Sequence, residues 1–412
     1  MIEFLQKKGG AVYFGISMLV FLFIVDAGEV KNQFIDIPHI ESPILPLYFV
    51  IALTLLFLFL LISLKKTKID SISILLLCPI IIHLTNSIYM GISDQFYVHM
   101  ATSILSFCVY LITINMNDEV SYLEKAFFLF FVILFVQIVA EANLSGPSKT
   151  IYSYKHDMCI PIGASNALSS KILPYFAFLF CVINDKYKKF LLCIAIFWAI
   201  TLTRSRGGFI DLFVILLILF AIKGKKSFFK VCFFVVASIS LVAIFYGFWN
   251  SELGSQIFVK NDSTVIGRFG LWEKGLELFC QHPILGNGFY YGTLATNPHN
   301  VIVDILMRSG TAGLILFVSI AITLWLKIKG QIANKYIQGG AVALLALFFH
   351  GLEEIVFFSY VHEIIIMTFV GYLVKKNELI SAEIIYVPCD RQCAAQRDDV
   401  RRIHDLGSRY FG

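Results

Sequence analysis

Charged residues are scarce in this chain. Only 15% of its 412 residues are Asp, Glu, Lys or Arg, while 58% are hydrophobic. A soluble domain is typically about a quarter charged and about half apolar, so this composition is not that of a soluble domain. The net charge of +5 comes from loop lysines that suit anionic lipid headgroups. The composition therefore predicts membrane lipids as the surroundings and gives no reason to expect nucleic-acid binding.

The apolar runs lack the alternation of apolar and polar residues that a membrane β-barrel requires. They are continuous, and many approach the ~20 residues that a helix needs to cross a bilayer. The first run lacks an A-x-A-like cleavage site and is expected to be retained. The sequence predicts an all-α polytopic membrane protein with about 12 transmembrane helices. The expected spans are 11–25, 45–64, 71–90, 95–115, 125–141, 167–184, 188–203, 207–222, 227–249, 310–326, 338–355 and 356–374.

Lysines cluster in alternate loops, and positively charged loops stay in the cytoplasm. The loops at 186–189 and 223–230 are then cytoplasmic, as are both termini. The chain divides into a transmembrane domain, 1–376, and a cytoplasmic C-terminal tail, 377–412. A large loop between spans 9 and 10, about 250–309, lies on the periplasmic side. Its apolar residues at helical spacing predict that it is helical.

The outward segments lack an Asp-x-Asp or comparable carboxylate cluster that would hold Mg²⁺ or Mn²⁺. Cys389, Cys393 and His404 in the tail match no standard zinc spacing. Neither a metal nor a cofactor is therefore expected. Cys159 and Cys280 both lie in outward segments, where an oxidising periplasm permits a disulfide; two unpaired thiols are the alternative.

The strongest polar motif is His299-Asn300, followed after nine residues by a Gly-x2-Gly pair, 310–313. Asn297 is expected to cap a helix that begins at Pro298, with His299 in its first turn. The positive end of a helix disfavours a second positive charge, so a neutral imidazole that can accept a proton is expected there. A histidine that only caps or hydrogen-bonds at the membrane surface is the alternative.

A polar stripe continues this helix. Asn300, Asp304 and Arg308 are four residues apart, so they are expected to line one face of the helix. That face is predicted to border a wet cleft near the histidine.

Arginines mark the outer junction of the seventh and eighth spans, where Arg204 and Arg206 precede Gly207-Gly208. Arginine rarely lies against hydrocarbon without a partner. Its planar fork suits phosphate oxygens, and the glycines let a ligand approach the backbone. The junction is therefore a candidate anion site, and arginines that snorkel to the headgroups are the alternative.

Another arginine, Arg268, is expected at the start of a helix, 269–281, which a glycine turn at 283–288 follows. The helix dipole favours acidic side chains at that end, so another interaction must hold this arginine. The candidates are a functional contact and an ion pair with Asp262 or Glu273.

Four motifs follow one another within about 200–315: Arg-Gly-Gly, Gly-Arg-x3-Trp, Pro-x2-Gly-x-Gly and His-Asn-x9-Gly-x2-Gly. In this combination the chain resembles the O-antigen ligase and polymerase superfamily, and the last motif is similar to that of the ligases. The resemblance implies a glycosyltransferase of the bacterial inner membrane that acts in lipopolysaccharide biosynthesis. Its donor would be a polysaccharide on undecaprenyl diphosphate, and its acceptor a sugar hydroxyl of lipid A-core at the periplasmic face.

The resemblance also implies a metal-independent, inverting transfer. His299 would be the catalytic base, and Arg206 and Arg268 would bind the diphosphate. Arg204 is a second candidate contact, because the spacing of the Arg-Gly-Gly element varies in the family. An O-antigen polymerase, which uses a second lipid-linked glycan as acceptor, is the nearest alternative. A protein O-oligosaccharyltransferase is a more distant one.

A transporter is the alternative from another functional class. Such proteins usually show an internal repeat, which is not evident here, and ionisable residues near the midplane of the membrane. The candidates are Asp211, His350, Glu353, Glu354 and His362. Most of them lie near the outer end of a span. An interfacial location is expected for Glu353 and Glu354, and the lining of a periplasmic cavity is the alternative.

The lysine pattern leads to a test of topology. Reporter fusions after Lys68, Lys188 and Lys226 should be cytoplasmic, whereas fusions within 255–295 should be periplasmic, because lysine-rich loops are retained in the cytoplasm. A cytoplasmic signal from 255–295 would reverse the orientation and place every candidate site on the wrong side.

Overall fold

The computed structural model describes residues 68–91, 94–115, 120–144, 165–203, 205–223, 263–288, 298–354 and 362–382. These residues are helical and contain no strand, so the all-α prediction is confirmed for them. The α-helices are α4 (Ser71–Met90), α5 (Asp94–Ile114), α6 (Val120–Leu144), α8 (Ser165–Val182), α9 (Lys186–Thr203), α10 (Arg206–Lys223), α13 (Ser263–Gln281), α14 (Val301–Ile328) and α15 (Lys335–Gly351). A 3-10 helix, η2 (Lys329–Gln331), follows α14, and a further helix spans 362–382.

Every expected span within the described residues coincides with a helix. Among these residues, the helices long and apolar enough to cross a membrane are Ser71–Tyr89, Val120–Ala140 and Val301–Gln331. Shorter apolar helices are Thr102–Ile114, Leu168–Val182 and Gly207–Ile222. The expected spans 11–25, 45–64 and 227–249 lie outside the described residues, so the total of about 12 stays a prediction. The last helix continues past the expected tail boundary at 377 to residue 382.

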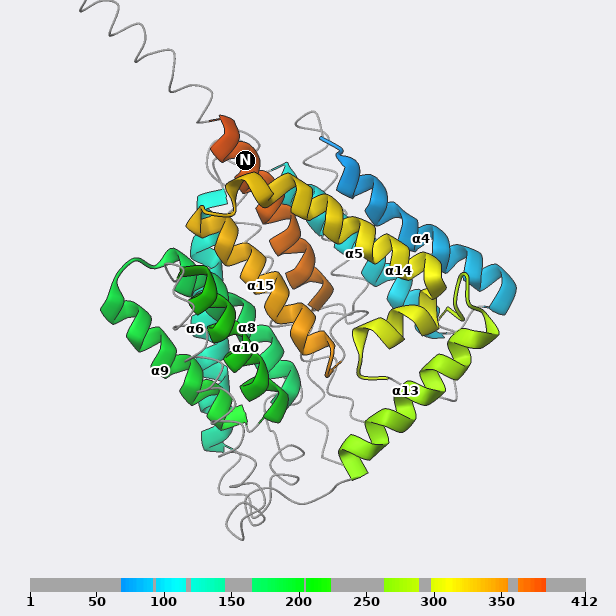
Figure 1. Cartoon of the computed structure of the whole chain (residues 1–412), viewed down its shortest axis with the longest axis horizontal. Helices are drawn as coiled ribbons and strands as arrows, with labels where there is room; N and C mark the ends of the chain where they lie inside the picture. Colours follow the sequence, from blue (N-terminus) through cyan, green and yellow to red (C-terminus); the bar gives the residue numbers. More distant parts are fainter. Residues whose placement is uncertain are drawn as a thin grey trace, which may run out of the picture.

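The described helices form two groups (Figure 1). In the first, α8 packs against α6, α9, α10 and α15; in the second, α14 packs against α4 and α13. α14 and α15 follow one another in the chain, but each makes its main contacts in a different group. A site that joins the end of α15 to the start of α14 therefore brings the two groups together.

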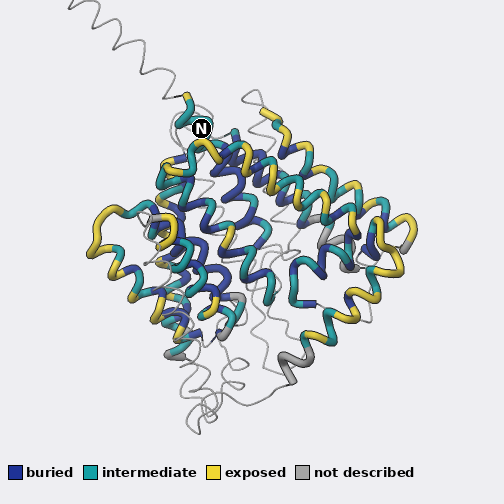
Figure 2. The backbone as a smooth tube through the Cα atoms, viewed as in Figure 1, coloured by how far each residue is buried: buried dark blue, intermediate teal, exposed yellow. Residues whose placement is uncertain are grey.

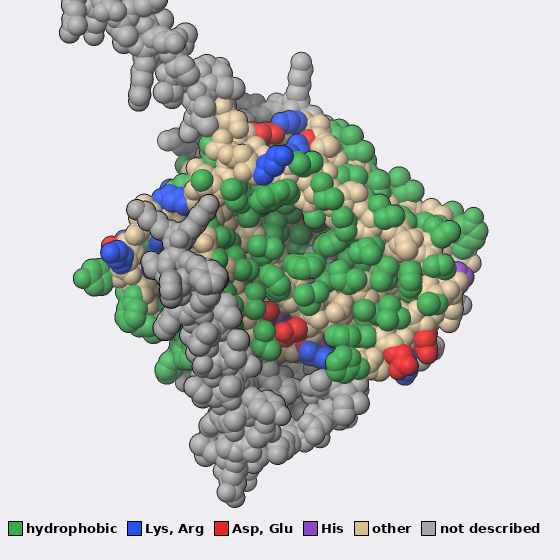
Figure 3. All heavy atoms as spheres, viewed as in Figure 1, with side chains coloured by type: hydrophobic (Ala, Val, Ile, Leu, Met, Phe, Trp, Pro, Cys, Tyr) green, Lys and Arg blue, Asp and Glu red, His purple; other side chains and the backbone are tan. Residues whose placement is uncertain are grey.

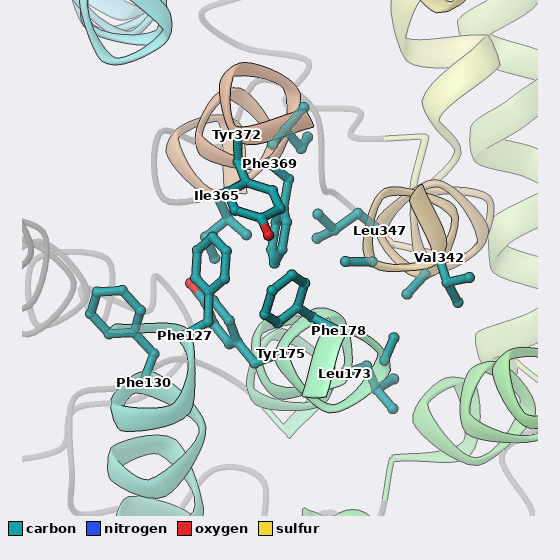
Figure 4. Close-up of a cluster of buried hydrophobic side chains, with 14 of the residues drawn as sticks. Phe127, Phe130, Leu173, Tyr175, Phe178, Val342, Leu347, Ile365, Phe369 and Tyr372 are labelled. Carbon is teal, nitrogen blue, oxygen red and sulfur yellow. The ribbon is translucent and has the colours of Figure 1, made fainter. Parts of the chain in front are cut away.

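Aromatic rings fill the core of the first group (Figure 4). Phe127 of α6 stacks on Phe369 with ring centroids 4.5 Å apart, and it meets the edge of Phe178 of α8 at 4.9 Å. Gly339 lets α15 approach α8 closely, because a Cβ there would lie 3.0 Å from the carbonyl oxygen of Phe178. Small residues at such contacts are typical of helices that pack in lipid.

The outer surface is strongly apolar. Buried residues concentrate between the helices, and exposed ones lie on their outer faces (Figure 2). On the face drawn in Figure 3, a broad band of hydrophobic side chains separates charged side chains at two opposite edges. Ile315 and Trp325 of α14 and Phe197 of α9 are more than half exposed. A bilayer would cover such a band and leave the charged edges at its two surfaces.

α14 is broken at Gly310, whose φ of 65° and ψ of −162° are not helical. The break frees backbone groups of α14, and the turn at 283–288 lies beside the break and hydrogen-bonds to them. Asn287 and Gly288 donate to the carbonyls of residues 307 and 308, and the amides of residues 311 and 312 donate to residues 283 and 284. Backbone groups that are freed inside a protein need such partners. The Pro-x2-Gly-x-Gly turn therefore fastens the end of α13 to the middle of α14.

The turn fits only because two glycines face each other. Gly286 and Gly310 both have positive φ, and a Cβ on Gly310 would lie 2.5 Å from the amide nitrogen of Gly286. Gly310→Ala should therefore lower the free energy of unfolding by about 1–3 kcal/mol or more, measured by thermal unfolding in detergent. Gly330→Ala is the control, because open space surrounds that position. Equal stability of the two variants would contradict this account of the break.

Candidate functional site

The segment before α14 differs from the prediction in one respect. α14 begins at Val301, and its N-cap is Asn300, whose side chain accepts from the amides of Ile302 and Val303. The expected start at Pro298, with His299 in the first turn, is wrong. The reason is that an asparagine side chain directly before Val301 satisfies the first free amides of the helix itself.

His299 lies just outside the helix in a strained conformation. Its φ of 48° makes it the only non-glycine residue with positive φ among those described. Such conformations persist where surrounding contacts hold them, and they cluster at functional sites. Two contacts hold this segment against the turn after α15: Asn300 Nδ2 donates to the carbonyl oxygen of Leu352 at 3.1 Å, and His299 Nδ1 lies 2.8 Å from Glu354 Oε2.

Arg268 reaches the same carboxylate from α13. The guanidinium of Arg268 forms an ion pair with Glu354 Oε1. α13 begins at Ser263, so the expected helix start beside Arg268 is wrong, and this arginine lies in the second turn. Its ion-pair partner is Glu354 instead of Glu273. The other sequence candidate, Asp262, lies outside the described residues.

Glu354 is the centre of this arrangement. Its side chain is 14% exposed and also accepts from Asn166 Nδ2 at the start of α8. The ion pair with Arg268 and the hydrogen bond with His299 Nδ1 both favour the charged form of this carboxylate. The carboxylate is therefore ionised at neutral pH and acts only as an acceptor. Side chains from distant helices enclose Glu354, and its expected interfacial depth in the membrane stays a prediction.

The Arg-Gly-Gly junction adjoins the same carboxylates. Ser205 precedes α10, accepts from the amide of Gly208 at 3.0 Å and donates to Asn166 Oδ1 at 2.7 Å. A Cβ on Gly207 would lie 2.5 Å from Glu353 Oε2, and a Cβ on Gly208 would lie 2.6 Å from the Cβ of Ser169 in α8. These glycines let α10 approach side chains of the protein itself, whereas the sequence interpretation gave that space to a ligand.

Two predicted anion ligands belong to this junction. α10 begins at Arg206, so its backbone lies next to the Ser205–Asn166 contact. The side chain of Arg206, and all of Arg204, lie outside the described residues. Their contact with an anion stays a prediction.

The polar stripe of α14 is real, but it does not border open water. Asn300 caps the helix, and Arg308 Nε donates to Asp304 Oδ1 at 2.6 Å. Asp304 is buried, and Arg308 is 14% exposed on its side chain. The predicted wet cleft along this face is therefore wrong, because these side chains turn toward each other inside the protein.

Further titratable pairs lie buried near the site. His350 of α15 pairs with Asp211 of α10, and Ser170 Oγ of α8 lies 2.6 Å from His362 Nε2. In the part of the chain that the structure describes, no group of three or more His, Cys, Asp or Glu residues is arranged to hold a metal ion. Cys280 is exposed on α13 with a free thiol, and Cys159 lies outside the described residues.

Comparison with known proteins identifies the segment that carries these residues. Residues 191–318 match the family model described as O-antigen ligase. This segment, about a third of the chain, supports membership of the O-antigen ligase superfamily. This match confirms the resemblance found in the sequence, and the superfamily covers ligases and polymerases, which are membrane enzymes of glycosyltransferase type. No curated protein matches the chain.

The O-antigen ligase segment contains only part of the site. It includes His299 and Arg268, but Asn166 and Glu354 lie outside it, on either side in the sequence. Sequence reasoning had placed Glu354 near the outer end of a span without linking it to the histidine. Two adjacent acids directly after an apolar helix were the available signal, but nothing in the sequence identified their partners.

Proposed function

We propose that the chain is an O-antigen ligase. It transfers a polysaccharide from undecaprenyl diphosphate to a sugar hydroxyl of lipid A-core at the periplasmic face of the inner membrane. The observation that carries this proposal is that His299 and Arg268, from two motifs of the matched segment, meet on one ionised carboxylate. A base beside a guanidinium is the pair of groups that transfer from a diphosphate requires.

His299 acts as the base. Glu354 accepts from Nδ1, so the neutral ring carries its proton on Nδ1 and its lone pair on Nε2. Nε2 takes the proton of the acceptor hydroxyl while the hydroxyl oxygen attacks the anomeric carbon of the donor. The bond from that carbon to the diphosphate oxygen breaks on the opposite face and leaves its electron pair on undecaprenyl diphosphate. The configuration inverts, and the base contributes about 10²–10⁴ in rate.

Arginines stabilise the leaving group. Charge develops on the diphosphate as the glycosidic bond breaks, and fixed guanidinium groups stabilise it best where water is scarce. Arg268 is placed beside the base, Arg206 begins the neighbouring helix, and Arg204 is the second candidate at that junction. The outward segments lack an Asp-x-Asp cluster, so in this proposal the arginines perform the charge stabilisation that a divalent metal performs elsewhere.

The positions of the lysines support a periplasmic site. Lys327 pairs with Asp70 at 3.2 Å, and Lys376 pairs with Glu124 at 2.8 Å. Lys327 lies in the last turn of α14, whereas His299 precedes its first residue, so the two lie at opposite ends of that helix. If the lysine-rich ends are cytoplasmic, the site faces the periplasm, where both the lipid-linked donor and the lipid A-core acceptor are presented.

A lipopolysaccharide gel tests the proposal. A strain without this chain should lose the polysaccharide ladder and accumulate lipid-linked polymer, because polymerisation continues without transfer to the core. Complementation with the wild-type chain should restore the ladder. Core that carries a single repeat would instead identify a polymerase, and an unchanged ladder would reject both activities.

Substitutions at the site separate catalysis from donor binding. His299→Ala should remove most turnover, about 10²–10⁴-fold, with donor binding largely intact, because the anion contacts remain. Arg206→Ala and Arg268→Ala should lower both turnover and donor affinity, and Lys at either position should restore only part, because an ammonium lacks the fork geometry. Initial rates and donor affinity are measured at matched expression in the membrane.

Lys327→Ala is the matched control for Arg268→Ala. Both cations pair with a carboxylate and are about equally exposed, 30% for Lys327 and 33% for Arg268, but Lys327 lies at the other end of the helices. It should retain near-normal turnover. Near-normal turnover of His299→Ala would reject the base, and unchanged donor affinity in both arginine variants would reject the diphosphate contacts.

A further inference from the structure

Two short segments hold each other across the two helix groups. Residues 299–300 precede α14, and residues 352–354 follow α15. Two side chains cross between them: Asn300 donates to the backbone of Leu352, and His299 meets the carboxylate of Glu354. Because the φ of His299 is positive, its backbone alone does not favour this position. The turn after α15 therefore sets the orientation of the imidazole.

Glu354 is itself held from two other directions. Asn166 donates to its Oε1 from α8, and Arg268 pairs with the same oxygen from α13. Oε2 is directed to His299. A carboxylate that is largely out of water needs such partners to stay ionised. With one oxygen fixed by other helices, the second is a rigid acceptor for the imidazole.

We propose that Glu354 is the positioning residue of the site, which orients His299 with its lone pair on Nε2 and stabilises the imidazolium that forms when the ring takes a proton. This inference rests on the proposed function, because it assigns a role relative to the catalytic base. The physical precedent is the acid of a catalytic triad, which holds a histidine in one tautomer without taking its proton.

Glu354 should have opposite effects on catalysis and on donor binding. Loss of the carboxylate removes the charged acceptor that fixes the tautomer of the histidine and stabilises its imidazolium, so the rate at saturating donor falls. The same change removes a negative charge from beside Arg268 and from the site where an anionic diphosphate would bind. Donor affinity should therefore stay the same or rise. A residue that only stabilised the fold would lower both quantities.

The experiment uses the full chain in detergent or nanodiscs with lipid-linked donor and core acceptor. Glu354→Gln should lower the rate at saturating donor about 10–100-fold, with donor affinity unchanged or tighter. Glu124→Gln is the matched control. Glu124 is 15% exposed against 14% for Glu354, and it pairs with Lys376 and accepts from Tyr372, but at the lysine-rich end. The control should keep its rate within about twofold, below the range expected for Glu354→Gln.

A double variant shows whether Glu354 acts through His299. In the His299→Ala background, Glu354→Gln should cause little further loss, because groups that act as a unit are not additive. If Glu354→Gln does not accumulate in the membrane, Glu354→Asp takes its place. It keeps the charge beside Arg268 and shortens the reach to the histidine, with the same expected loss of rate.

Three results would overturn the inference: a normal rate in Glu354→Gln beside an inactive His299→Ala, a fall in donor affinity that matches the fall in rate, or fully additive losses in the double variant. Near-normal turnover of His299→Ala would instead reject the proposed base, and with it the role of Glu354. The two failures are therefore distinguishable.

Discussion

The backbones of Gly286 and Gly310 lie so close that neither residue has room for a side chain. This contact lets the turn at 283–288 enter the break in α14 and pair with the backbone groups that the break exposes. Met307, Ser309 and Gly310 are buried at the break, and buried backbone groups need hydrogen-bond partners, so the break and the turn require each other. As a result α13 is fixed relative to α14. Arg268, in the second turn of α13, is thereby brought to the carboxylate that His299 also meets.

The same constraint explains why the charged residues of the site come as a connected set. A lone carboxylate or guanidinium beside an apolar core pays a large desolvation cost unless it is paired and hydrogen-bonded. Glu354 satisfies this requirement with Asn166, Arg268 and His299, which come from three different parts of the chain. Asp304 and Arg308 satisfy it locally, four residues apart on one helix. The first set joins several helices, whereas the ion pair of the second lies within α14.

Glycines account for much of the O-antigen ligase motif pattern through packing. Gly207 makes room for the Glu353 carboxylate, and Gly208 makes room for Ser169 of α8. Gly310 admits the turn, and Gly313 lies where a Cβ would meet the side chain of Ser309. The glycines of these motifs thus allow α10 and α14 to pack closely against neighbouring segments. His299 and Arg268 both contact Glu354 where these segments meet.

Local patterns in the sequence determined the helices. Each continuous apolar run within the described residues coincides with a helix, because a bilayer favours helices of that length and excludes open strands. The resemblance carried by the motifs implied that His299 and Arg268 are neighbours in function, and both residues lie within the segment that matches the family model. Helix starts were less predictable. A cap depends on which side chain reaches the first amides, and here Asn300 does so instead of Asn297.

The tertiary structure alone decided which residue lies beside His299. Glu354 is 55 residues from His299 and 86 from Arg268 along the chain, and no periodicity links them. Two adjacent acids after an apolar helix fit both an interfacial location and the lining of a periplasmic cavity, and nothing in the sequence named their partners. Sequence pattern reports the face and length of each helix, because these follow from local spacing. It does not report which helix ends converge, because that depends on packing between distant segments.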